Sequence, residues 1–248
     1  MPATTESTWA PGPLRPLLTE GSVHVWRADL TAVGDDLREL LCADERARAE
    51  RFASERDGKL WGRSRGLLRE LIGRYLQQEP ASLRFVVGEH GKPALVEDTD
   101  GSPAAASRSS AEASRAPRPS FNMSHSGRLA LYAFSHAGAV GVDVEVARRP
   151  IDEVAIALRT LGEAEAQRLQ ALDPPARRRE FLGAWARHEA ELKCLGVGLG
   201  AAPANGADCG VWAVELEIGS DAAAAVAAER PARELCCWEW QPQVSKVF

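Results

Sequence analysis

The sequence predicts a mixed fold of α-helices and β-strands, built as one large domain or two small ones. Segments with alternating apolar and polar residues, typical of strands, are interleaved with segments whose apolar residues recur at helical spacing. The chain has 248 residues, which is enough for either arrangement. Both halves share a coarse order of strand, helices and strands, the pattern that an internal duplication would leave.

The first half begins with an arm and a strand and continues with helices. Residues 1–21 are rich in Pro, Thr and Gly and predict a loose arm, and the alternation over 23–30 predicts a half-buried strand. Helical patterns cover about 35–52 and 57–77, and residues 83–95 predict a strand, a turn and a short strand. We expect the apolar face of the second helix to pack on the core.

A segment of different composition separates the two halves. Residues 97–119 are almost all small, polar or proline, which predicts a flexible insertion that carries no chemistry. The second half is expected to contain strands over 121–135 and 139–146 joined by a turn, helical stretches over 151–171 and 176–195, and strands over 211–218 and 234–240 around a helix or loop at 221–229.

Composition argues against several classes of protein. The net charge of −5 and the pI near 5.7 argue against a nucleic-acid binder. No apolar run reaches the roughly 18–20 residues that span a bilayer, and the N-terminus lacks the pattern of a signal peptide. The five cysteines include no CxxC pair, which favours reduced thiols. We therefore expect a cytoplasmic protein that binds neither nucleic acid nor membrane.

The motif GVDVE at residues 141–145 places two acids in a segment suited to burial. Because side chains alternate along a strand, Asp143 and Glu145 would share one face, with Val142 and Val144 on the other. Two carboxylates this close repel each other and are costly to bury unpaired. The motif therefore predicts a positive group between them.

The helix over 176–195 supplies further candidates. The residues of one helical face, which we expect to pack against the core, are Phe181, Trp185, His188, Leu192 and Leu195. Glu189 and Lys193 lie at the edge of this face, four residues apart, as either an ordinary ion pair or part of a site. His188 is either a satisfied core residue or a functional one.

Two motifs that resemble known signatures are excluded by their context. HEAEL is not the zinc-protease motif HExxH, because position 192 is leucine and the second ligand is missing. GVGLG at 196–200 follows a helix, whereas a dinucleotide-binding glycine motif follows a strand. Neither motif therefore assigns a function.

Taken together, the acids and a set of basic residues suit a site for a metal and phosphates. Asp143, Glu145 and Glu189 would suit a hard cation such as Mg²⁺, which completes its shell with water and phosphate oxygens. The residues that could hold phosphates are Arg46, Arg48, Arg51, Arg65, Arg69, Lys92 and Lys193, with His125 in the turn-like NMSHSGR. The arginines could equally be solvated helix faces, and Lys92 a plain turn residue.

Several motifs in a fixed order resemble the Sfp-type 4′-phosphopantetheinyl transferases. They are FNMSHSGR, GVDVE and WARHEAELKCLGVGL, preceded by ERFASERDGKLWGRSRGLLRELIGRYL and EHGKPAL. The resemblance covers roughly residues 22–218. A series of motifs in the right order is far more specific than any one of them.

The resemblance implies both a fold and a reaction. The fold would be a two-lobed α+β pseudodimer of similar halves, with one lobe over 1–138 and the other over 139–248. The reaction would transfer 4′-phosphopantetheine from coenzyme A to a serine of an acyl or peptidyl carrier protein, as in fatty-acid synthesis or secondary metabolite biosynthesis, and would release 3′,5′-ADP. Coenzyme A and Mg²⁺ would bind between the lobes, and an internal pseudodimer favours a monomer.

The resemblance also implies a role for each matching residue. Asp143, Glu145 and Glu189 would bind Mg²⁺, and Glu189 would also act as general base. Lys193 would complete the catalytic set with Asp143 and Glu189 by contacting the phosphates. The residues that would bind coenzyme A are Arg48, Arg65, Lys92, Ser124, His125 and Lys193.

One position departs from the family pattern. The family usually has lysine before the metal-binding glutamate, and this chain has His188. Because histidine is mostly neutral near pH 7, part of the positive field over the pyrophosphate would be missing unless Arg187 or Lys193 compensates. We then expect lower or more pH-dependent activity.

Two other functions are compatible with parts of the sequence. The first is a catalytically weakened module that only binds coenzyme A or a carrier protein, which would not need all three acids and Lys193. The second is a Mg²⁺-dependent phosphohydrolase, which would use the acids but leaves the motifs around His125 and Lys92 unexplained.

Overall fold

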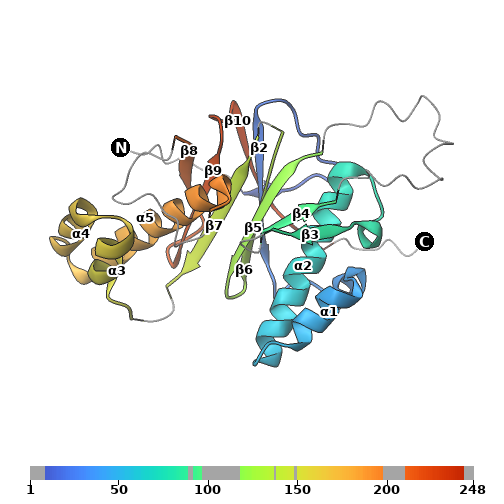
Figure 1. Cartoon of the computed structure of the whole chain (residues 1–248), viewed down its shortest axis with the longest axis horizontal. Coiled ribbons are helices and arrows are strands. Elements are labelled where there is room, and N and C mark those ends of the chain that lie inside the picture. The colour runs from blue at the N-terminus through green and yellow to red at the C-terminus, as the bar shows by residue number, and fades with distance from the viewer. Residues whose placement is uncertain are drawn as a thin grey trace.

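Two lobes, each with a 22-residue helix packed on a β-sheet, make up the protein (Figure 1). The computed structural model describes residues 9–88, 92–96, 118–136, 138–147, 150–197 and 210–242. Most of the expected insertion, residues 97–117, lies outside this set. The α+β class and the two lobes are confirmed.

The first lobe is built on a five-stranded sheet in the order β1-β10-β2-β6-β5. Its elements are β1 (Ala10–Pro11), β2 (Ser22–Asp29), η1 (Asp35–Leu40), α1 (Ala43–Glu50), α2 (Glu55–Leu76), η2 (Pro80–Ser82), β3 (Phe85–Val87), β4 (Pro93–Leu95), β5 (Ser120–Ser126), β6 (Leu129–Ser135) and, from the end of the chain, β10 (Glu234–Glu239). β3 and β4 form a separate two-stranded hairpin. The expected boundary at 138–139 stays a prediction, but β10 pairs with β2 and so belongs to the first sheet.

The second lobe is built on a three-stranded antiparallel sheet in the order β7-β9-β8. Its elements are β7 (Val140–Val146), α3 (Glu153–Thr160), α4 (Glu163–Gln170), α5 (Pro174–Leu195), β8 (Trp212–Leu216) and β9 (Ala222–Ala228). Asp173 caps the start of α5 by accepting a hydrogen bond from the Ala176 amide, and Gly196 ends the helix with a φ of 72°. The expected helix end at Gly196 is confirmed.

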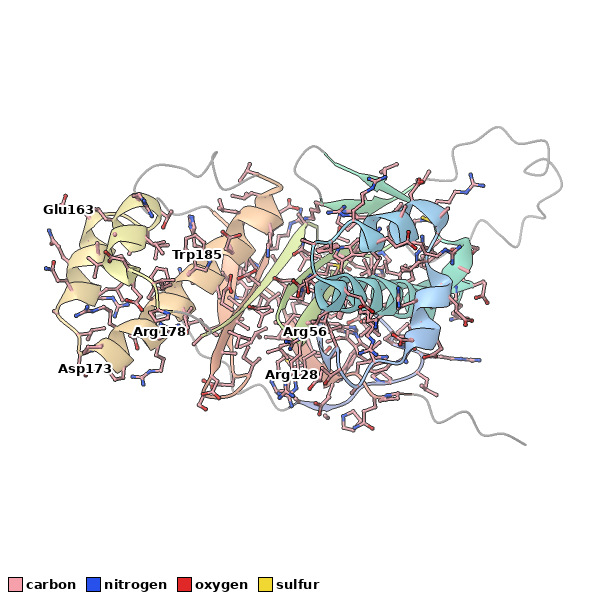
Figure 2. All side chains as sticks on the ribbon, turned by 90° about the horizontal axis from the view of Figure 1, so that it is seen from below. Arg56, Arg128, Glu163, Asp173, Arg178 and Trp185 are labelled. Carbon is pink, nitrogen blue, oxygen red and sulfur yellow. The ribbon has the colours of Figure 1, made fainter. Side chains whose placement is uncertain are left out.

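The two sheets pack face to face between the two long helices. Val25 of β2 and Leu131 of β6 meet Val142 and Val144 of β7 in the core that joins the sheets. α2 covers the outer face of the first sheet, and α5 covers the outer face of the second. In Figure 2 the first lobe, with Arg56 and Arg128, and the second, with Arg178 and Trp185, lie on opposite sides of this junction. The result is a four-layer stack of helix, sheet, sheet and helix.

A glycine brings α5 unusually close to β7. A Cβ atom at Gly141 would lie 2.0 Å from the Ala190 carbonyl oxygen and 2.4 Å from the Cys194 amide nitrogen. The helix meets the sheet through small side chains, because Ala186 and Ala190 pack against alanines of β9. The glycine of GVDVE therefore allows the helix that carries Glu189 and Lys193 to lie directly against the strand that carries Asp143.

Several expected elements differ in detail in the first lobe. The arm is not loose from Trp9 onward, because Ala10–Pro11 pairs with β10 and Leu18 is buried. The expected helix over 35–52 is broken into η1 and α1, because Leu41 and Cys42 are extended. The expected single strand over 121–135 is the hairpin β5–β6, which turns at Gly127 with a φ of 62°.

Two further expectations are corrected in the second lobe. Residues 222–228, expected as a helix or loop, form the central strand β9, because their small side chains fit between α5 on one face and the first sheet on the other. The core-facing side of α5 agrees with the expectation only in part. Phe181 and Leu192 are buried as expected, but Leu195 is exposed and His188 is half-buried, and the small residues Ala186, Ala190 and Cys194 are buried instead. No helix within the described ranges is long and apolar enough to cross a membrane.

Candidate functional site

Polar side chains of β5 hold β7 where the two sheets meet. The side-chain oxygen of Asn122 accepts a hydrogen bond from the Val142 amide at 3.0 Å, and the Ser126 hydroxyl accepts one from the Val146 amide at 3.2 Å. The Ser126 hydroxyl also donates to Glu145 at 3.3 Å. These bonds fix the strand of the two acids in position across the lobe boundary.

Asp143 is the most buried acid of the site and has two partners. It is 3% exposed, and its Oδ1 accepts from the Ser124 hydroxyl at 2.7 Å and from the Lys193 ammonium at 2.5 Å. The Lys193 ammonium also donates to the Ser124 hydroxyl at 3.1 Å. Three residues that the sequence singled out, from β5, β7 and α5, therefore meet in one hydrogen-bonded group.

The three acids form an electrostatically unfavourable cluster. Burial and then the charge of Asp143 raise the pKa of Glu145. Burial also raises the pKa of Glu189, with Lys193 opposing the rise and Asp143 and Glu145 adding to it. Within the described part of the chain, Asp143 Oδ2 and Glu189 Oε1 are buried without a hydrogen-bond partner. The three carboxylates therefore have more acceptor oxygens than the surrounding side chains and amides supply donors for.

The arrangement is not a ready-made metal cage. Over the residues that the structure describes, no group of three or more His, Cys, Asp or Glu side chains could hold a metal ion as placed. The Lys193 ammonium instead lies against Asp143, as the positive group that the GVDVE motif requires. The two unpartnered carboxylate oxygens nevertheless fit a hard cation, because such ions take carboxylate ligands.

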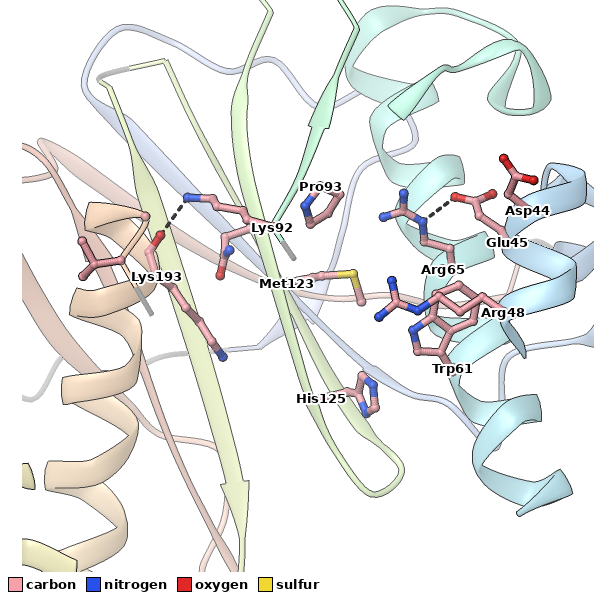
Figure 3. A pocket seen from close by; sticks show the side chains of 13 residues that line it. Asp44, Glu45, Arg48, Trp61, Arg65, Lys92, Pro93, Met123, His125 and Lys193 are labelled. Carbon is pink, nitrogen blue, oxygen red and sulfur yellow. Dashed lines mark hydrogen bonds and ion pairs between the residues drawn. The ribbon is translucent and has the colours of Figure 1, made fainter. Parts of the chain in front are cut away.

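A cavity of about 380 Å³ lies beside this cluster, between the end of α5 and the helices α1 and α2 (Figure 3). Its lining residues are Asp44, Glu45, Arg48, Trp61, Arg65, Lys92, Pro93, Asn122, Met123, His125, Lys193, Gly196 and Val197. Both lobes contribute, and four Arg or Lys side chains face two carboxylates. Such a positive hollow suits an anionic ligand.

The structure thus brings five of the six expected coenzyme A ligands to one cavity. Arg48, Arg65, Lys92, His125 and Lys193 all line it, which their spread over the sequence did not guarantee. The sixth residue, Ser124, does not line the cavity, and its hydroxyl donates to Asp143 instead. The three acids do not line this cavity.

Lys92 has partners that the sequence did not suggest. Its ammonium donates to the backbone carbonyls of Lys193 at 2.8 Å and Val140 at 3.2 Å. Burial lowers the pKa of Lys92. The residue therefore joins the β3–β4 hairpin of the first lobe to the last turn of α5, besides facing the cavity.

Glu145 opens onto a second hollow on the far side of the acids. This hollow of about 440 Å³ is lined by Ser126, Glu145, Val146, Ala147, Ile151, Ile156, Arg178, Phe181, Leu182 and Trp185. Apolar side chains dominate its wall, and the Phe181 and Trp185 rings stack with centroids 6.0 Å apart. The acid cluster therefore lies between a cationic cavity and an apolar one.

His188 lies outside both hollows. Its ring is 6.5 Å from that of Trp185, and burial lowers its pKa, so the imidazole is neutral near pH 7. The positive charge that the family pattern would place here is absent, as the sequence indicated.

Comparison with known proteins decides the family. Residues 139–241 match a family model described as the 4′-phosphopantetheinyl transferase superfamily, and residues 35–137 match one described as 4′-phosphopantetheinyl transferase, N-terminal. The 4′-phosphopantetheinyl transferase HetI of Nostoc sp. is 32% identical over 197 residues, which cover 78% of this chain and 77% of HetI. The 4′-phosphopantetheinyl transferase Sfp of Bacillus subtilis is 28% identical over 160 residues, 64% of this chain and 62% of Sfp.

The chain belongs to the 4′-phosphopantetheinyl transferase family. It is an enzyme of this type, so its general reaction is the transfer of a 4′-phosphopantetheinyl group. The match to the N-terminal family model ends at residue 137 and the match to the superfamily model begins at residue 139, in the segment between β6 and β7.

Sequence reasoning missed several residues of the transferase that line the cationic cavity. Trp61 lies one helical turn before Arg65 on α2, so the spacing of the two could have revealed it. Glu45 gave no such signal, because an acid was not expected in a site for phosphates. Met123 and Asn122 lie within the quoted motif FNMSHSGR but had been assigned no role.

Proposed function

We propose that this transferase moves 4′-phosphopantetheine from coenzyme A to a serine of an acyl or peptidyl carrier protein and releases 3′,5′-ADP, with Mg²⁺ required. The observation that carries the proposal is the acid cluster with two unpartnered buried oxygens directly beside a cationic cavity. A doubly charged metal and a pyrophosphate together would balance both charges.

The cationic cavity would bind the phosphates of coenzyme A. Arg48 and Arg65 approach it from α1 and α2, and Lys92 and Lys193 from the opposite side (Figure 3). Guanidinium groups suit phosphate because they offer paired N–H donors in one plane. Exposed His125 would add a hydrogen bond at the rim. These charges would hold the nucleotide end of the substrate against the acids.

Asp143, Glu145 and Glu189 would hold Mg²⁺, as the donor set and its unpartnered oxygens favour. When bound, the metal would neutralise and orient the pyrophosphate. Ser124 keeps Asp143 in place through its hydroxyl. Lys193, which bonds Asp143 and also lines the cavity, could exchange the carboxylate for a phosphate oxygen.

The transfer step needs a base and a group that stabilises the leaving phosphate. The carrier serine oxygen would form a bond to the β-phosphorus, and the bond from that phosphorus to the 3′,5′-ADP oxygen would break. Glu189 would take the serine proton, as a carboxylate positioned beside the reacting groups can act as general base. Lys193 would balance the charge left on the ADP phosphate.

The apolar hollow on the other side of Glu145 suits the remaining partners. The carrier serine must reach the phosphorus from the side away from the nucleotide, which is the side of Trp185 and Phe181. Because both lobes of one chain line the cationic cavity, we propose that a monomer is sufficient for activity. The expected cytoplasmic location stays a prediction.

A second candidate is a catalytically weakened module that binds coenzyme A or a carrier. The neutral His188, where the family usually has lysine, favours it. The acids and Lys193, already placed in one cluster, favour the enzyme instead.

Intact-protein mass spectrometry tests the reaction directly. The protein is incubated with coenzyme A, Mg²⁺ and a panel of apo acyl, peptidyl and aryl carrier domains, with EDTA as control. We expect a carrier to gain one phosphopantetheine arm only when Mg²⁺ is present. No gain on any carrier while coenzyme A still binds would support the weakened module, and equal gain in EDTA would contradict the metal site.

A further inference from the structure

We propose that Glu45 is a positioning residue that holds Arg65 in the orientation in which its guanidinium group binds a phosphate of coenzyme A. The inference rests on the proposed function, because it takes coenzyme A as the ligand of the cationic cavity. It assigns a role to an acid in a site for phosphates, where a negative charge alone would weaken binding.

The Glu45 carboxylate accepts from three donors, two on α2 and one at the residue that precedes α1. Its Oε1 accepts from Arg65 Nε at 2.5 Å, and its Oε2 accepts from Arg69 Nε at 2.7 Å and from the Cys42 amide at 3.0 Å. The Glu45 side chain is 10% exposed, and those of Arg65 and Arg69 are 9% and 1% exposed. The acid therefore ties the start of α1 to the middle of α2 in a nearly dry environment.

The two arginines use their remaining donors differently. Arg69 gives its Nη1 to the carbonyls of Pro80 and Leu83, so it serves the fold. Arg65 lines the cavity, and in Figure 3 its guanidinium extends from α2 toward Lys92 and Pro93 while its Nε points back to Glu45. Binding of Glu45 at the Nε leaves the terminal nitrogens of Arg65 for a ligand.

An aromatic ring completes the support of Arg65. The guanidinium carbon of Arg65 lies 4.3 Å from the centre of the Phe85 ring, which restricts the group to one plane. An ion pair at one edge and a ring beneath leave the guanidinium little freedom. A ligand phosphate then meets a donor pair whose orientation is already set, which reduces the entropy cost of binding.

Glutamine cannot replace Glu45 in this role. An amide offers one acceptor oxygen and one donor nitrogen, whereas both Arg65 and Arg69 need an acceptor. Burial raises the pKa of Glu45, but the hydrogen bonds from Arg69 and Arg65 outweigh this and lower it, so the carboxylate is ionised at neutral pH. The charge also offsets the repulsion between the two arginines.

The test is a double-mutant cycle on coenzyme A binding, measured by calorimetry without a carrier. The proteins are the wild type, Glu45→Gln, Arg65→Ala and the double variant. We expect Glu45→Gln to weaken coenzyme A binding about tenfold, as loss of an oriented charge-assisted contact would. In the Arg65→Ala background, the same change should alter the affinity less than about twofold.

Glu70→Gln is the matched control. Glu70 also lies on α2 and forms a shielded ion pair, with Arg74, and accepts from Trp240 Nε1 at 2.9 Å, but it does not line the cavity. We expect Glu70→Gln to lower the thermal stability, as Glu45→Gln does, without changing the affinity for coenzyme A.

The outcomes separate this inference from the proposed function. Equal weakening by Glu45→Gln in both backgrounds, or an effect of Glu70→Gln as large as that of Glu45→Gln, would show a purely structural role and overturn the inference. Wild-type protein that does not bind coenzyme A would overturn both proposals. If the effects of the Glu45 and Arg65 substitutions on coenzyme A binding are coupled but no carrier is modified, the proposed reaction would be overturned and the role of Glu45 would be supported.

Discussion

Glu145 and Glu189 are acids whose burial reduces the stability of the fold, at the positions proposed to bind the metal. Glu145 and Glu189 have raised pKa values because of burial, and neighbouring carboxylates add to the shift. A carboxyl whose pKa is higher in the folded than in the unfolded chain stabilises the fold below its usual pKa. That contribution is lost as the pH rises through the raised value, so the ionised acids destabilise the fold at neutral pH.

Glu189→Gln should therefore separate activity from stability. We expect transfer to fall at least about 100-fold, because the proposed general base is lost. The melting temperature without Mg²⁺ should rise, because one of three repelling charges is removed. Mass spectrometry of the carrier and thermal unfolding measure the two effects.

Glu191→Gln is the control for that variant. Glu191 lies two residues further along α5 but pairs with Arg187 at 3.1 Å, away from the acid cluster. It should leave transfer within about twofold of the wild type, because substitutions away from a site usually have small effects. If Glu189→Gln kept the wild-type rate of transfer, the assignment of Glu189 as general base would be wrong.

A buried histidine in the first lobe links stability to pH. His24 Nδ1 lies 2.9 Å from the Tyr75 hydroxyl, which accepts from Trp26 Nε1 at 2.9 Å. All three groups are satisfied when the hydroxyl donates to an unprotonated Nδ1. Burial, with a smaller effect of the charge of His136, lowers the pKa of His24 to about 4. The fold therefore favours the neutral ring.

His24 should weaken the protein in mild acid. The His24 ring binds a proton more tightly in the unfolded chain than in the folded one. The stability that the neutral ring contributes is therefore complete above the ordinary histidine pKa and is lost as the pH falls from about 6.5 to about 4. The loss should amount to about 3 kcal/mol at most. Urea unfolding at several pH values should show a flatter profile for His24→Leu than for the wild type. His125→Gln, at an exposed position, should keep the wild-type profile, and parallel profiles for all three proteins would refute the role of His24.

At the scale of elements, the contact of α5 with β7 determines whether a site exists. α5 carries Glu189 and Lys193, and β7 carries Asp143 and Glu145. Gly141 lets the backbones of the two elements touch, and the alanines of β9 leave room for the rest of the helix. A small outward shift of α5 would separate Lys193 from Asp143, which are now 2.5 Å apart.

Gly141→Ala should therefore damage both fold and function. The new Cβ would meet backbone atoms that cannot turn aside, so we expect a loss of about 1–3 kcal/mol, typical of overpacking. Transfer should fall further than the unfolded fraction explains, because α5 must move. Chemical unfolding and carrier modification at the same temperature would measure both.

Gly183→Ala on the same helix is the opposite case. The nearest atoms to its Cβ would belong to the Glu215 side chain, at 3.5 Å or more, so it should stabilise the helix by about 0.5–1 kcal/mol. If Gly141→Ala were as stable as Gly183→Ala, the close approach of helix and strand would be disproved.

At the scale of the whole molecule, the end of the chain holds the two lobes together. β10 follows the second lobe in sequence but pairs with both β1 and β2 in the first sheet. A residue near the start of the chain likewise contacts the second lobe: Trp9 Nε1 donates to the Glu217 carbonyl, which follows β8. The lobes are therefore not separable at one point of the sequence.

A chain that ends at Arg233 should fail to fold its first lobe. It lacks β10, so the backbone groups of β2 that pair with it would lose their hydrogen-bond partners. We expect loss of cooperative thermal unfolding, whereas a chain that ends at Pro242 keeps β10 and should unfold like the full protein. A cooperative transition in the shorter chain would show that the first lobe folds without β10.

The sequence by itself determined the local features of this protein. Hydrophobic periodicity located the two long helices, because each buries an apolar or small-residue face over many turns. Alternation in GVDVE put Asp143 and Glu145 on one face of a strand, and the ordered motifs identified the family. These properties depend on residues close together in the chain.

Only the tertiary structure decided what depends on residues far apart in the chain. The alanines of β9 carry little intrinsic preference for a strand, and the packing of α5 and of the first sheet on their two faces fixed the element. The partners of Lys92 and Glu45 come from other elements, up to 101 residues away, so no local pattern could reveal them. The contact of the Lys193 ammonium with Asp143 is likewise a product of packing, because helix and strand meet only in the folded chain.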